Sequence, residues 1–579
     1  MSQAPETETP EPAESERAES EPAESEPAQS EPAASDKHAR PAFIAFIGAE
    51  LVALVFYMSV SRPMWFYLDE WDFLANRTGG NFGDLFRAHN EHWVTLPILV
   101  YRGMWWAVGL RSYRPYQLII VLMHLGAAYL VRLIMRRVGV RPWTATIVAC
   151  VLVFFGAGYQ NIVLPFQMTL VGSLIFGFVH LLLATHDGPL DRRDYWGLAA
   201  GLAALMCSGI GVSMVIAVGA AVLLARGWRL ALLHTVPLAA AYAVWYAWIG
   251  HIGYNGYRAG PGQILSFLRT FVAAGFSAMG HNRGLGVILG VLLIAGLLVA
   301  WRPLDRAEFR RQAAMPLGLL VGSIALLGIT GLGRAGTSSF LEKSRYLHLF
   351  IAMTLPALGV AADAVMRRAK SKVVSVVVIA ALLAGIPANL NVMVNYMHKG
   401  IVKNQVPYKA LMLTLPRVPI AKEVPREVKP EQLLAHFVTI GWLLDGVKSG
   451  RIPKPSEITD ANATMAALRL SFVQKRGAFE PGAICVPIAK PLIFHLKTGQ
   501  RVVLRAPNAT IRVFPPTENV DGTYPWLYIT FAGSTLVADR EVRFQLANVR
   551  APFAQVCAQP GLVRAARLAG ERAYPPAPG

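Results

Sequence analysis

Seven acidic and histidine side chains lie between Phe66 and Pro97, and they are the first candidates for chemistry in this sequence. They are Asp69, Glu70, Asp72, Asp84, His89, Glu91 and His92. The stretch follows an apolar run that ends near Ser61. Ionisable groups gathered at the edge of a membrane-embedded body often have perturbed pKa values and often do proton chemistry. The sequence therefore favours proton transfer in this stretch.

Asp69 and Glu70 are the predicted catalytic pair, with Asp69 as the general base. Aromatic neighbours such as Phe66 and Trp71 would hold the two carboxylates near the lipid headgroups, where burial and charge shift a pKa. A carboxylate placed there can take a proton from an acceptor hydroxyl. An isolated Asp-Glu pair at the end of a helix is otherwise an ordinary solvated cap, so the neighbourhood carries this prediction.

The remaining polar residues of the stretch are predicted to bind substrate. Asp72, His89, Glu91 and His92 could form hydrogen bonds to a sugar or support proton transfer. Alternatively, a divalent metal ion could be held by Asp69, Asp72, His89 and His92. Two histidines three residues apart are a weak metal signal, and hydrogen bonding to substrate is the favoured interpretation. No cofactor is firmly indicated.

The composition is that of a membrane protein with soluble appendages. Of 579 residues, 54% are hydrophobic and only 16% are charged, and the mean hydropathy is +0.40. The net charge of +19 does not point to a nucleic-acid partner, because most arginines lie between apolar runs. Residues 1–40 repeat a Glu-Ser-Glu-Pro-Ala unit and are predicted to be a disordered acidic tail on the cytoplasmic side.

A transmembrane domain is predicted over residues 41–391, with about eleven membrane-spanning helices. The predicted spans are 43–61, 115–135, 143–155, 161–183, 195–207, 211–224, 230–249, 284–300, 313–331, 346–366 and 373–390. The segment 195–224 is too long for one crossing and is expected to turn at Ser208 and Gly209. The segment 96–110 is expected to be an interfacial helix within a first extracytoplasmic loop at 62–114.

Charge sets the predicted orientation. Lys37 and Arg40 precede the first span, and the arginine-rich loops then all fall on one side, which the positive-inside rule makes cytoplasmic. The N-terminus is thus predicted to be cytoplasmic, and the odd number of spans places residues 392–579 outside. A bacterial inner membrane is the predicted location.

Residues 392–579 are predicted to form an extracytoplasmic α+β domain. A helical stretch is expected near 431–447, and a β-sandwich from about residue 480 onward. Its expected strands are 491–496, 501–504, 510–514, 526–531 and 541–546. Cys485 and Cys557 flank nearly all of these strands and are a plausible disulfide pair in an oxidising compartment. Cys150 and Cys207 fall within spans, where they are predicted to be small core residues.

Two further outer segments carry candidate binding residues. Arg334, Lys343 and Arg345 lie in the predicted loop 331–346, and such cations suit a phosphate or pyrophosphate leaving group; Tyr346 follows them. Attraction to anionic lipid headgroups explains these cations equally well. His281 and Arg283 end a predicted outer loop, 251–283, which could be a lid over the acceptor sugar or an aromatic anchor.

The acidic pair Asp69-Glu70, placed soon after the first helix, resembles the first periplasmic loop of the GT-C superfamily of integral membrane glycosyltransferases. The number of spans and the terminal extracytoplasmic domain resemble that superfamily too. The resemblance implies a polyprenyl-phosphate sugar as donor and an Asp of this loop as catalytic base, which by position is Asp69 with Glu70 as partner. It also implies that basic residues such as Arg345 contact the lipid phosphate. The run His89 to His92 is not typical of a particular subfamily.

The sequence thus predicts a glycosyltransferase that inverts the sugar and transfers it to an envelope glycan, lipid or protein. A flippase or transporter for lipid-linked glycans is a second hypothesis, which would depend on Glu50 or His124 and tolerate loss of Asp69. A glycan-binding envelope assembly protein is a third, and it would depend on Trp526 and Tyr528. The donor sugar, the acceptor and the oligomeric state are not set by the sequence.

Overall fold

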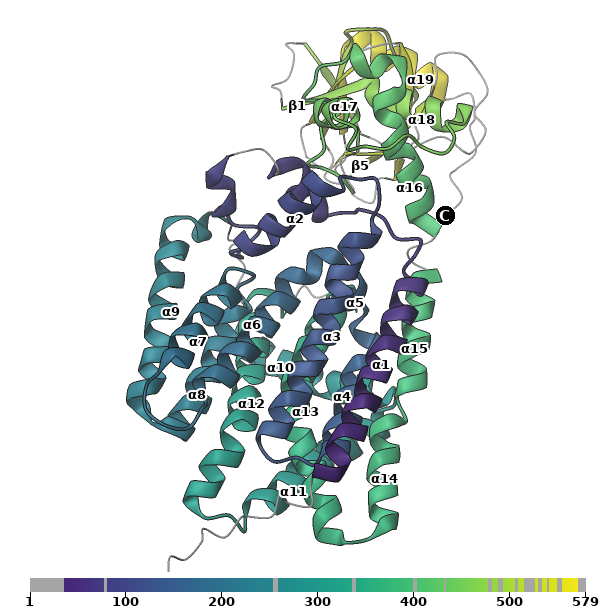
Figure 1. Cartoon of the computed structure of the whole chain (residues 1–579). Coiled ribbons are helices and arrows are strands. Elements are labelled where there is room, and N and C mark those ends of the chain that lie inside the picture. Colours follow the sequence, from purple (N-terminus) through teal and green to yellow (C-terminus); the bar gives the residue numbers. More distant parts are fainter. Residues whose placement is uncertain are drawn as a thin grey trace, which may run out of the picture.

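The computed structural model contains a bundle of helices with a smaller domain at one end (Figure 1). The described residues are 36–77, 81–253, 259–335, 340–398, 403–431, 434–476, 482–487, 493–505, 509–514, 526–529, 534–538, 541–548 and 555–570. Most of the predicted disordered tail, residues 1–35, lies outside these ranges.

The bundle follows the predicted apolar segments closely. Its helices are α1 (Ala39–Val60), α3 (Arg114–Arg137), α4 (Pro142–Val153), α5 (Tyr159–Val163), α6 (Met168–Ala184), α7 (Arg192–Leu205), α8 (Gly211–Arg226), α9 (Trp228–Trp248), α10 (Pro261–Gly280), α11 (Arg283–Trp301), α12 (Arg306–Arg334), α13 (Phe340–Ala369), α14 (Lys372–Leu383) and α15 (Ile386–Asn395). Short helical turns are η1 (Asp36–His38), η2 (Asp72–Asn76), η3 (Phe82–Leu85), η4 (Gly156–Gly158), η5 (Pro165–Gln167), η6 (Gly250–Gly253), η8 (Leu415–Arg417) and η9 (Pro419–Lys422). Side chains of Asn282, Asp305 and Ser371 cap helix N-termini, as their residue types favour.

Eight helices of the described chain are long and apolar enough to cross a membrane, or nine if the bent pair 142–153 and 156–163 is one span. Every predicted span corresponds to a helix of the bundle, but the predicted spans 195–207 and 211–224 become α7 and α8, with only 14 and 16 residues. The break between them at Met206 to Ile210 is where the turn was expected. The total of eleven crossings therefore stays a prediction, and so does its orientation.

Segment 251–283 differs from the prediction of a loop. Most of it forms α10, which packs against α11, α12 and α13. Its buried residues Phe267, Phe271 and Met279 recur with helical spacing, and this face lies against the bundle. Residues 261–280 are thus a packed helix and not the loop that was expected to be a lid or an aromatic anchor, and His281 follows in a turn.

Close helix contact in the bundle depends on small residues. Gly318 and Gly322 of α12 face α8, where a β-carbon at either position would lie 2.5 Å from an atom of Ala217. The spacing of four residues keeps both glycines on one face, so the two backbones approach closely. This contact packs α8, although short, firmly against α12.

The first loop contains α2 (Thr95–Ala107), which Figure 1 shows across the end of the bundle, beneath the terminal domain. One side of α2 meets that domain through Trp105, whose ring stacks on Trp442 with centroids 4.8 Å apart. Trp106 is exposed on its other side. A helix with an exposed Trp at the end of a bundle fits the predicted interfacial position.

The terminal domain combines helices with two antiparallel sheets. Its elements are α16 (Lys403–Thr414), α17 (Ile440–Lys448), α18 (Asp460–Leu470), β1 (Phe472–Arg476), β2 (Ile484–Pro487), β3 (Ile493–Leu496), β4 (Arg501–Arg505), β5 (Ala509–Phe514), β6 (Trp526–Ile529), β7 (Ser534–Ala538), β8 (Val542–Asn548), β9 (Gln555–Ala558) and α19 (Pro560–Gly570). The sheets have the orders β1-β7-β4-β9-β2 and β3-β8-β5-β6. Only the second half of the predicted helix 431–447 is helical. A sandwich stays a prediction, and the side chains of Trp526 and Tyr528 lie outside the described part.

A disulfide joins Cys485 and Cys557, which face each other in the register of β2 and β9. The bond closes a long loop, since the two residues are 72 positions apart. A crosslink of this length restricts the unfolded domain and stabilises the folded one by roughly 4 kcal/mol in the chain-entropy treatment.

We predict that the denatured protein exposes two free thiols without reductant and all four cysteines after reduction. Counting the mass shifts caused by a maleimide-linked polyethylene glycol on a gel measures this directly. Four thiols in the unreduced, membrane-extracted protein would contradict the pairing and the oxidising location together. As a control, the Cys485→Ser variant should expose three thiols both with and without reductant, because Cys557 has lost its partner.

Candidate functional site

The first loop turns back over the bundle at Leu68, directly before the candidate base Asp69. Leu68 has φ of +50°, a conformation that is uncommon for a residue with a side chain. Its N–H donates to the carbonyl oxygen of Leu434 in the terminal domain, at 2.9 Å. The backbone of Trp65 is held similarly, by the side-chain oxygen of Gln405 at 2.6 Å. Segments more than 300 residues downstream therefore set the direction in which Asp69 leaves the backbone.

Glu70 is only 2% exposed, and its carboxyl group is surrounded by tyrosines. The Tyr101 hydroxyl donates to Oε1 at 2.7 Å, and the Tyr113 hydroxyl and the Tyr67 N–H donate to Oε2 at 3.0 and 3.1 Å. Burial raises the pKa of this carboxyl to about 8, although these hydrogen bonds oppose the rise. Glu70 was predicted to be part of the catalytic pair; its contacts instead indicate that it anchors the loop.

A buried ionic group holds the other half of the loop. Asp72 Oδ2 lies 2.7 Å from the Arg77 guanidinium and 2.7 Å from His89 Nδ1. Arg77 also donates to the carbonyl oxygens of Arg87 and Ala88 at 2.6 and 3.0 Å. Burial alone would raise the pKa of Asp72, but the His89 hydrogen bond and the Arg77 charge outweigh it and lower that pKa. Asp72 is therefore ionised, and it is taken up by internal contacts.

Asp69 and His89 approach each other at the surface of the loop. His89 Nε2 lies 4.0 Å from Asp69 Oδ1, and the Asp69 side chain is 43% exposed. Because the Asp72 carboxylate accepts at Nδ1, that nitrogen carries the proton and Nε2 is left to exchange one. Nε2 is buried and has no hydrogen-bond partner in the described chain. Asp72, His89 and the accessible Asp69 thus follow one another in space, although the 4.0 Å between His89 and Asp69 is longer than a hydrogen bond.

The side chain of His92 is bonded to a different segment of the chain. Its Nδ1 accepts from the N–H of Gly209 at 3.3 Å, in the turn between α7 and α8. Burial, followed by the charges of His89, Arg334 and Arg345, lowers the pKa of His92 to about 3, so the ring is neutral. Glu91 is half-buried beside it.

The proposed metal set of Asp69, Asp72, His89 and His92 is not gathered in the described structure. The ligand atoms of no three of these residues all lie within 4.8 Å of one another. Asp72 is taken up by Arg77 and His89 Nδ1. The alternative of a metal ion held by these four residues is therefore not supported by their arrangement, and the favoured interpretation, hydrogen bonding to substrate, stays a prediction.

Two arginines from the later helices of the bundle lie near the loop: Arg334 at the end of α12 and Arg345 in α13. The guanidinium carbons of Arg334 and Arg345 lie 5.9 and 5.8 Å from the ring centroid of the buried Tyr346. Burial and the charges of Asp69 and Glu70 raise the pKa of Tyr67, and the positive charge of Arg345 opposes this rise. Arg345 Nε is buried without a partner in the described chain. The side chain of Lys343 lies outside the described part.

A mainly apolar cavity of about 1330 Å³ reaches Ser344, the residue before Arg345. It lies between α10, α11 and α13, and its wall includes Ser344, the neighbour of Arg345. His281 and Arg283, which were predicted to contact substrate, lie in the same wall, together with Arg269. The cavity is large enough for part of a lipid chain, and its polar residues can meet a headgroup.

Several residues of this site were not singled out from the sequence. Tyr101, Tyr113 and Arg77 stabilise the loop, and Trp442 packs edge-on against Trp71 with centroids 6.1 Å apart. The exposed His436 lies within electrostatic range of Asp69. Desolvation lowers the pKa of His436, and the negative charge of Asp69 partly opposes this. The clustering of Tyr101, Tyr113 and Tyr116 around a helix start was a usable signal; nothing local marked His436 or Trp442.

No protein-family model matches the chain, and no curated protein matches it. Among solved structures it is similar to ArnT from Cupriavidus metallidurans, in the apo state and bound to undecaprenyl phosphate, with 16% identity and a TM-score of 0.41 over 74% of this chain and 88% of that one. It is also similar to an Archaeoglobus fulgidus oligosaccharyltransferase tethered with an acceptor peptide, with 15% identity and a TM-score of 0.41 over 65% of this chain and 58% of that one.

Both neighbours are membrane glycosyltransferases of the GT-C superfamily, the group that the first loop resembles in sequence. At this identity and TM-score the likeness carries no argument about the reaction of this chain. The site itself must therefore carry the functional argument.

We predict that Glu70→Gln flattens the dependence of stability on pH. The wild-type carboxyl keeps its proton up to about pH 8 in the fold but loses it near 4.5 in the unfolded chain. Its stabilising contribution is therefore complete below about pH 4.5 and is lost as the pH rises through about 8. Thermal midpoints of the detergent-solubilised protein between pH 5 and 9 measure this, and Glu91→Gln is the matched control. A slope unchanged in Glu70→Gln would contradict a buried neutral carboxyl.

Proposed function

We propose that this protein is a membrane glycosyltransferase that moves a sugar from a polyprenyl-phosphate donor to a hydroxyl of an extracytoplasmic cell-envelope acceptor. Asp69 is the general base in this proposal, and Arg334 and Arg345 bind the phosphate of the donor. The acceptor is a glycan, lipid or protein of the envelope. The protein acts in a bacterial inner membrane, with the first loop and residues 392–579 outside.

The proposal is supported by an acid and a cation that both act on Tyr67. Burial raises the pKa of Tyr67 most, the Asp69 charge adds to the rise, and the Arg345 charge opposes it. A proton acceptor and a phosphate-binding cation are the two groups that displacement at a sugar phosphate requires. The Asp69 side chain is accessible to a substrate, and Arg345 Nε has no hydrogen-bond partner in the described chain.

The cavity beside Arg345 suits the donor. Its wall is largely apolar, with cations at Arg269 and Arg283, as an isoprenoid chain with an anionic head demands. Sugar nucleotides are cytoplasmic, so a site on the outer face needs a lipid-linked donor.

The proposed step is a direct displacement. Asp69 takes the proton of the acceptor hydroxyl as its oxygen bonds to the anomeric carbon. The bond from that carbon to the phosphate oxygen breaks, and the electron pair leaves with the polyprenyl phosphate. Arg334 and Arg345 stabilise the negative charge that forms on the phosphate. His89 can pass the proton on, because its Nε2 faces Asp69. Attack opposite the leaving group inverts the sugar.

We expect Asp69→Asn to lower the rate of transfer by roughly 10²- to 10⁴-fold, because the amide cannot accept the proton. Transfer of radiolabelled sugar from polyprenyl phosphate to a membrane acceptor measures the rate. Asp84→Asn is the matched control, since Asp84 lies in the same loop but pairs with Arg87. Equal transfer by the wild type and Asp69→Asn would remove Asp69 from the mechanism.

Gly290→Leu should raise the KM for the long-chain donor on the order of tenfold, equivalent to about 1.4 kcal/mol. Gly290 lines the cavity, and a β-carbon there meets no atom within 4 Å, so the new side chain enters the cavity without disturbing the fold. A donor with two isoprene units should be affected less. Gly48→Leu on α1, where a β-carbon is equally free, is the control. An unchanged KM for the long donor would separate the cavity from donor binding.

A further inference from the structure

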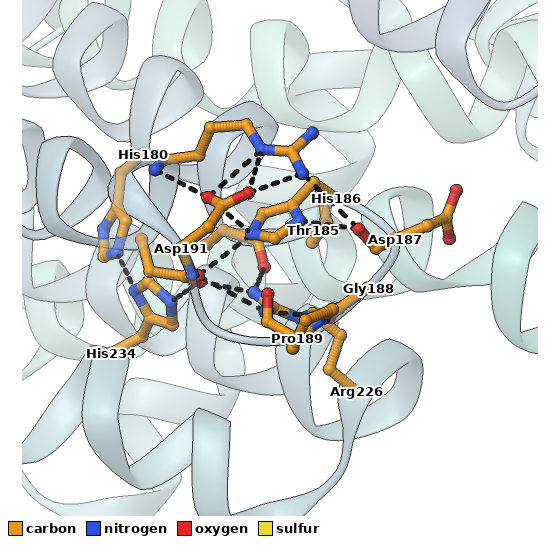
Figure 2. Close-up of polar contacts among 12 residues, drawn as sticks. His180, Thr185, His186, Asp187, Gly188, Pro189, Asp191, Arg226 and His234 are labelled. Atoms are coloured by element: carbon orange, nitrogen blue, oxygen red, sulfur yellow. Dashed lines mark hydrogen bonds and ion pairs between the residues drawn. The ribbon is translucent and has the colours of Figure 1, made fainter.

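A second polar cluster lies at the end of the bundle opposite α2, where α6, α7, α8 and α9 meet. Figure 2 shows its members, among them His186, Asp191, Arg226 and His234. With Asp194 they form a continuous network of hydrogen bonds and ion pairs. His186, Asp194 and His234 are almost completely buried. The proposed glycosyl transfer uses none of these residues, so their cost of burial needs a separate explanation.

The ring of His186 is placed so that a positive group must lie at its Nε2. Nδ1 lies 2.8 Å from the carbonyl oxygen of Asp187, which can only accept, so Nδ1 carries a proton. Nε2 faces Asp194 Oδ2 at 3.0 Å and Asp191 Oδ1 at 3.5 Å. A bare lone pair would be repelled by both oxygens. Either a second proton or a metal ion therefore lies between the ring and the carboxylates.

The contact between His186 Nδ1 and the Asp187 carbonyl oxygen is of the kind that metal-binding histidines usually make. A ligating imidazole commonly donates its other N–H to a backbone carbonyl, which fixes the tautomer and turns the free nitrogen to the metal. His186 is 1% exposed and held this way, so its ring is oriented before any ion binds. The ligand atoms of His186, Asp191 and Asp194 all lie within 4.8 Å of one another.

The two carboxylates are also fixed in advance. Asp191 caps α7 by accepting from the Arg193 N–H at 2.7 Å, and Asp194 Oδ2 accepts from the Asp191 N–H at 2.9 Å. This reciprocal cap sets the distance between the two acids. On the other side, Asp194 Oδ1 is bound by Arg226 and by His234 Nε2 at 2.9 Å. Oδ2 lies on the side of His186, and Arg226 Nη2 also donates to it at 3.3 Å.

We propose that His186, Asp191 and Asp194 bind a divalent first-row transition metal ion in place of the second proton of His186. One imidazole and two carboxylates suit Zn²⁺ or Mn²⁺ and disfavour Ca²⁺, which prefers oxygen ligands alone. The ion ties the connection after α6 to the start of α7. The ion lies at the end of the bundle opposite Asp69. Metal binding can therefore be tested independently of the proposed glycosyl transfer.

The neighbouring arginines set the character of the site. Arg193 pairs with Asp191, and Arg226 pairs with Asp194, so the carboxylates are partly neutralised. Both guanidinium groups therefore lie close to any ion held between these carboxylates.

The test measures metal on the full-length protein in detergent, after removal of any affinity tag and of bound metal with EDTA. The protein is equilibrated with ZnCl₂ or with MnCl₂ and desalted. Inductively coupled plasma mass spectrometry then measures the number of metal ions bound per chain. We expect one ion per chain for at least one of the two metals. His186→Asn should lose that ion. Asp187→Asn should keep it, because the Asp187 side chain is exposed and only its carbonyl oxygen serves the site.

A second variant guards against a folding defect in His186→Asn. Asp191→Ser keeps an acceptor for the cap of α7 but removes a ligand, so the helix is preserved and affinity should fall at least about tenfold. Binding of Zn²⁺ and Mn²⁺ no higher than in the buffer blank would overturn the proposal and assign the second proton to His186. Equal binding by the wild type and by both the His186→Asn and Asp191→Ser variants would overturn it too, since the ion would lie elsewhere.

Discussion

The ion pair between Asp72 and Arg77 is the contact on which the first loop depends. Both side chains are almost fully buried, so each would be strongly destabilising without the other. The carbonyls of Arg87 and Ala88 accept from Nη1 and Nη2 of Arg77, and His89 Nδ1 donates to Asp72. The pair thereby joins the two halves of the loop and orients the imidazole. The accessible Asp69 can sit at the rim of the bundle only because this interior is already closed.

The fold was largely predictable because long apolar runs between charged connections leave few alternatives in a membrane. The turn near Ser208 and the helix 95–107 followed from length and from tryptophan placement. The failures also have physical causes. The segment 261–280 was taken for a loop because of its glycines and its flanking tyrosine, although Phe267 and Phe271 already had helical spacing. Strands β1, β2, β7 and β9 were missed because short strands stabilised by distant partners have weak local patterns.

The site was predictable only where it is local. Asp69 and His89 are close in sequence and share one loop, so residue types alone brought them forward. The groups that decide their roles are distant: Leu434 sets the backbone before Asp69, and Tyr113 buries Glu70. Neighbouring acids therefore received opposite environments that no spacing rule foresees. The metal set failed for a related reason, because internal hydrogen bonds compete for the same nitrogen and oxygen atoms as a metal.

The distribution of polar groups also bears on transport. Between the two ends of the bundle, His124 accepts from His348 through Nδ1 and donates to the Val153 carbonyl through Nε2, and Asn161 reaches the other side of His348. This chain of donors and acceptors ends on a backbone oxygen within the bundle. His180 is likewise occupied by His234. A proton or ion path needs groups that can exchange partners along its length, whereas both ring nitrogens of His124 already have partners within the bundle. A carrier acting through His124 would first have to break both contacts. Glu50 is an exception, because its Oε1 is buried without a partner in the described chain.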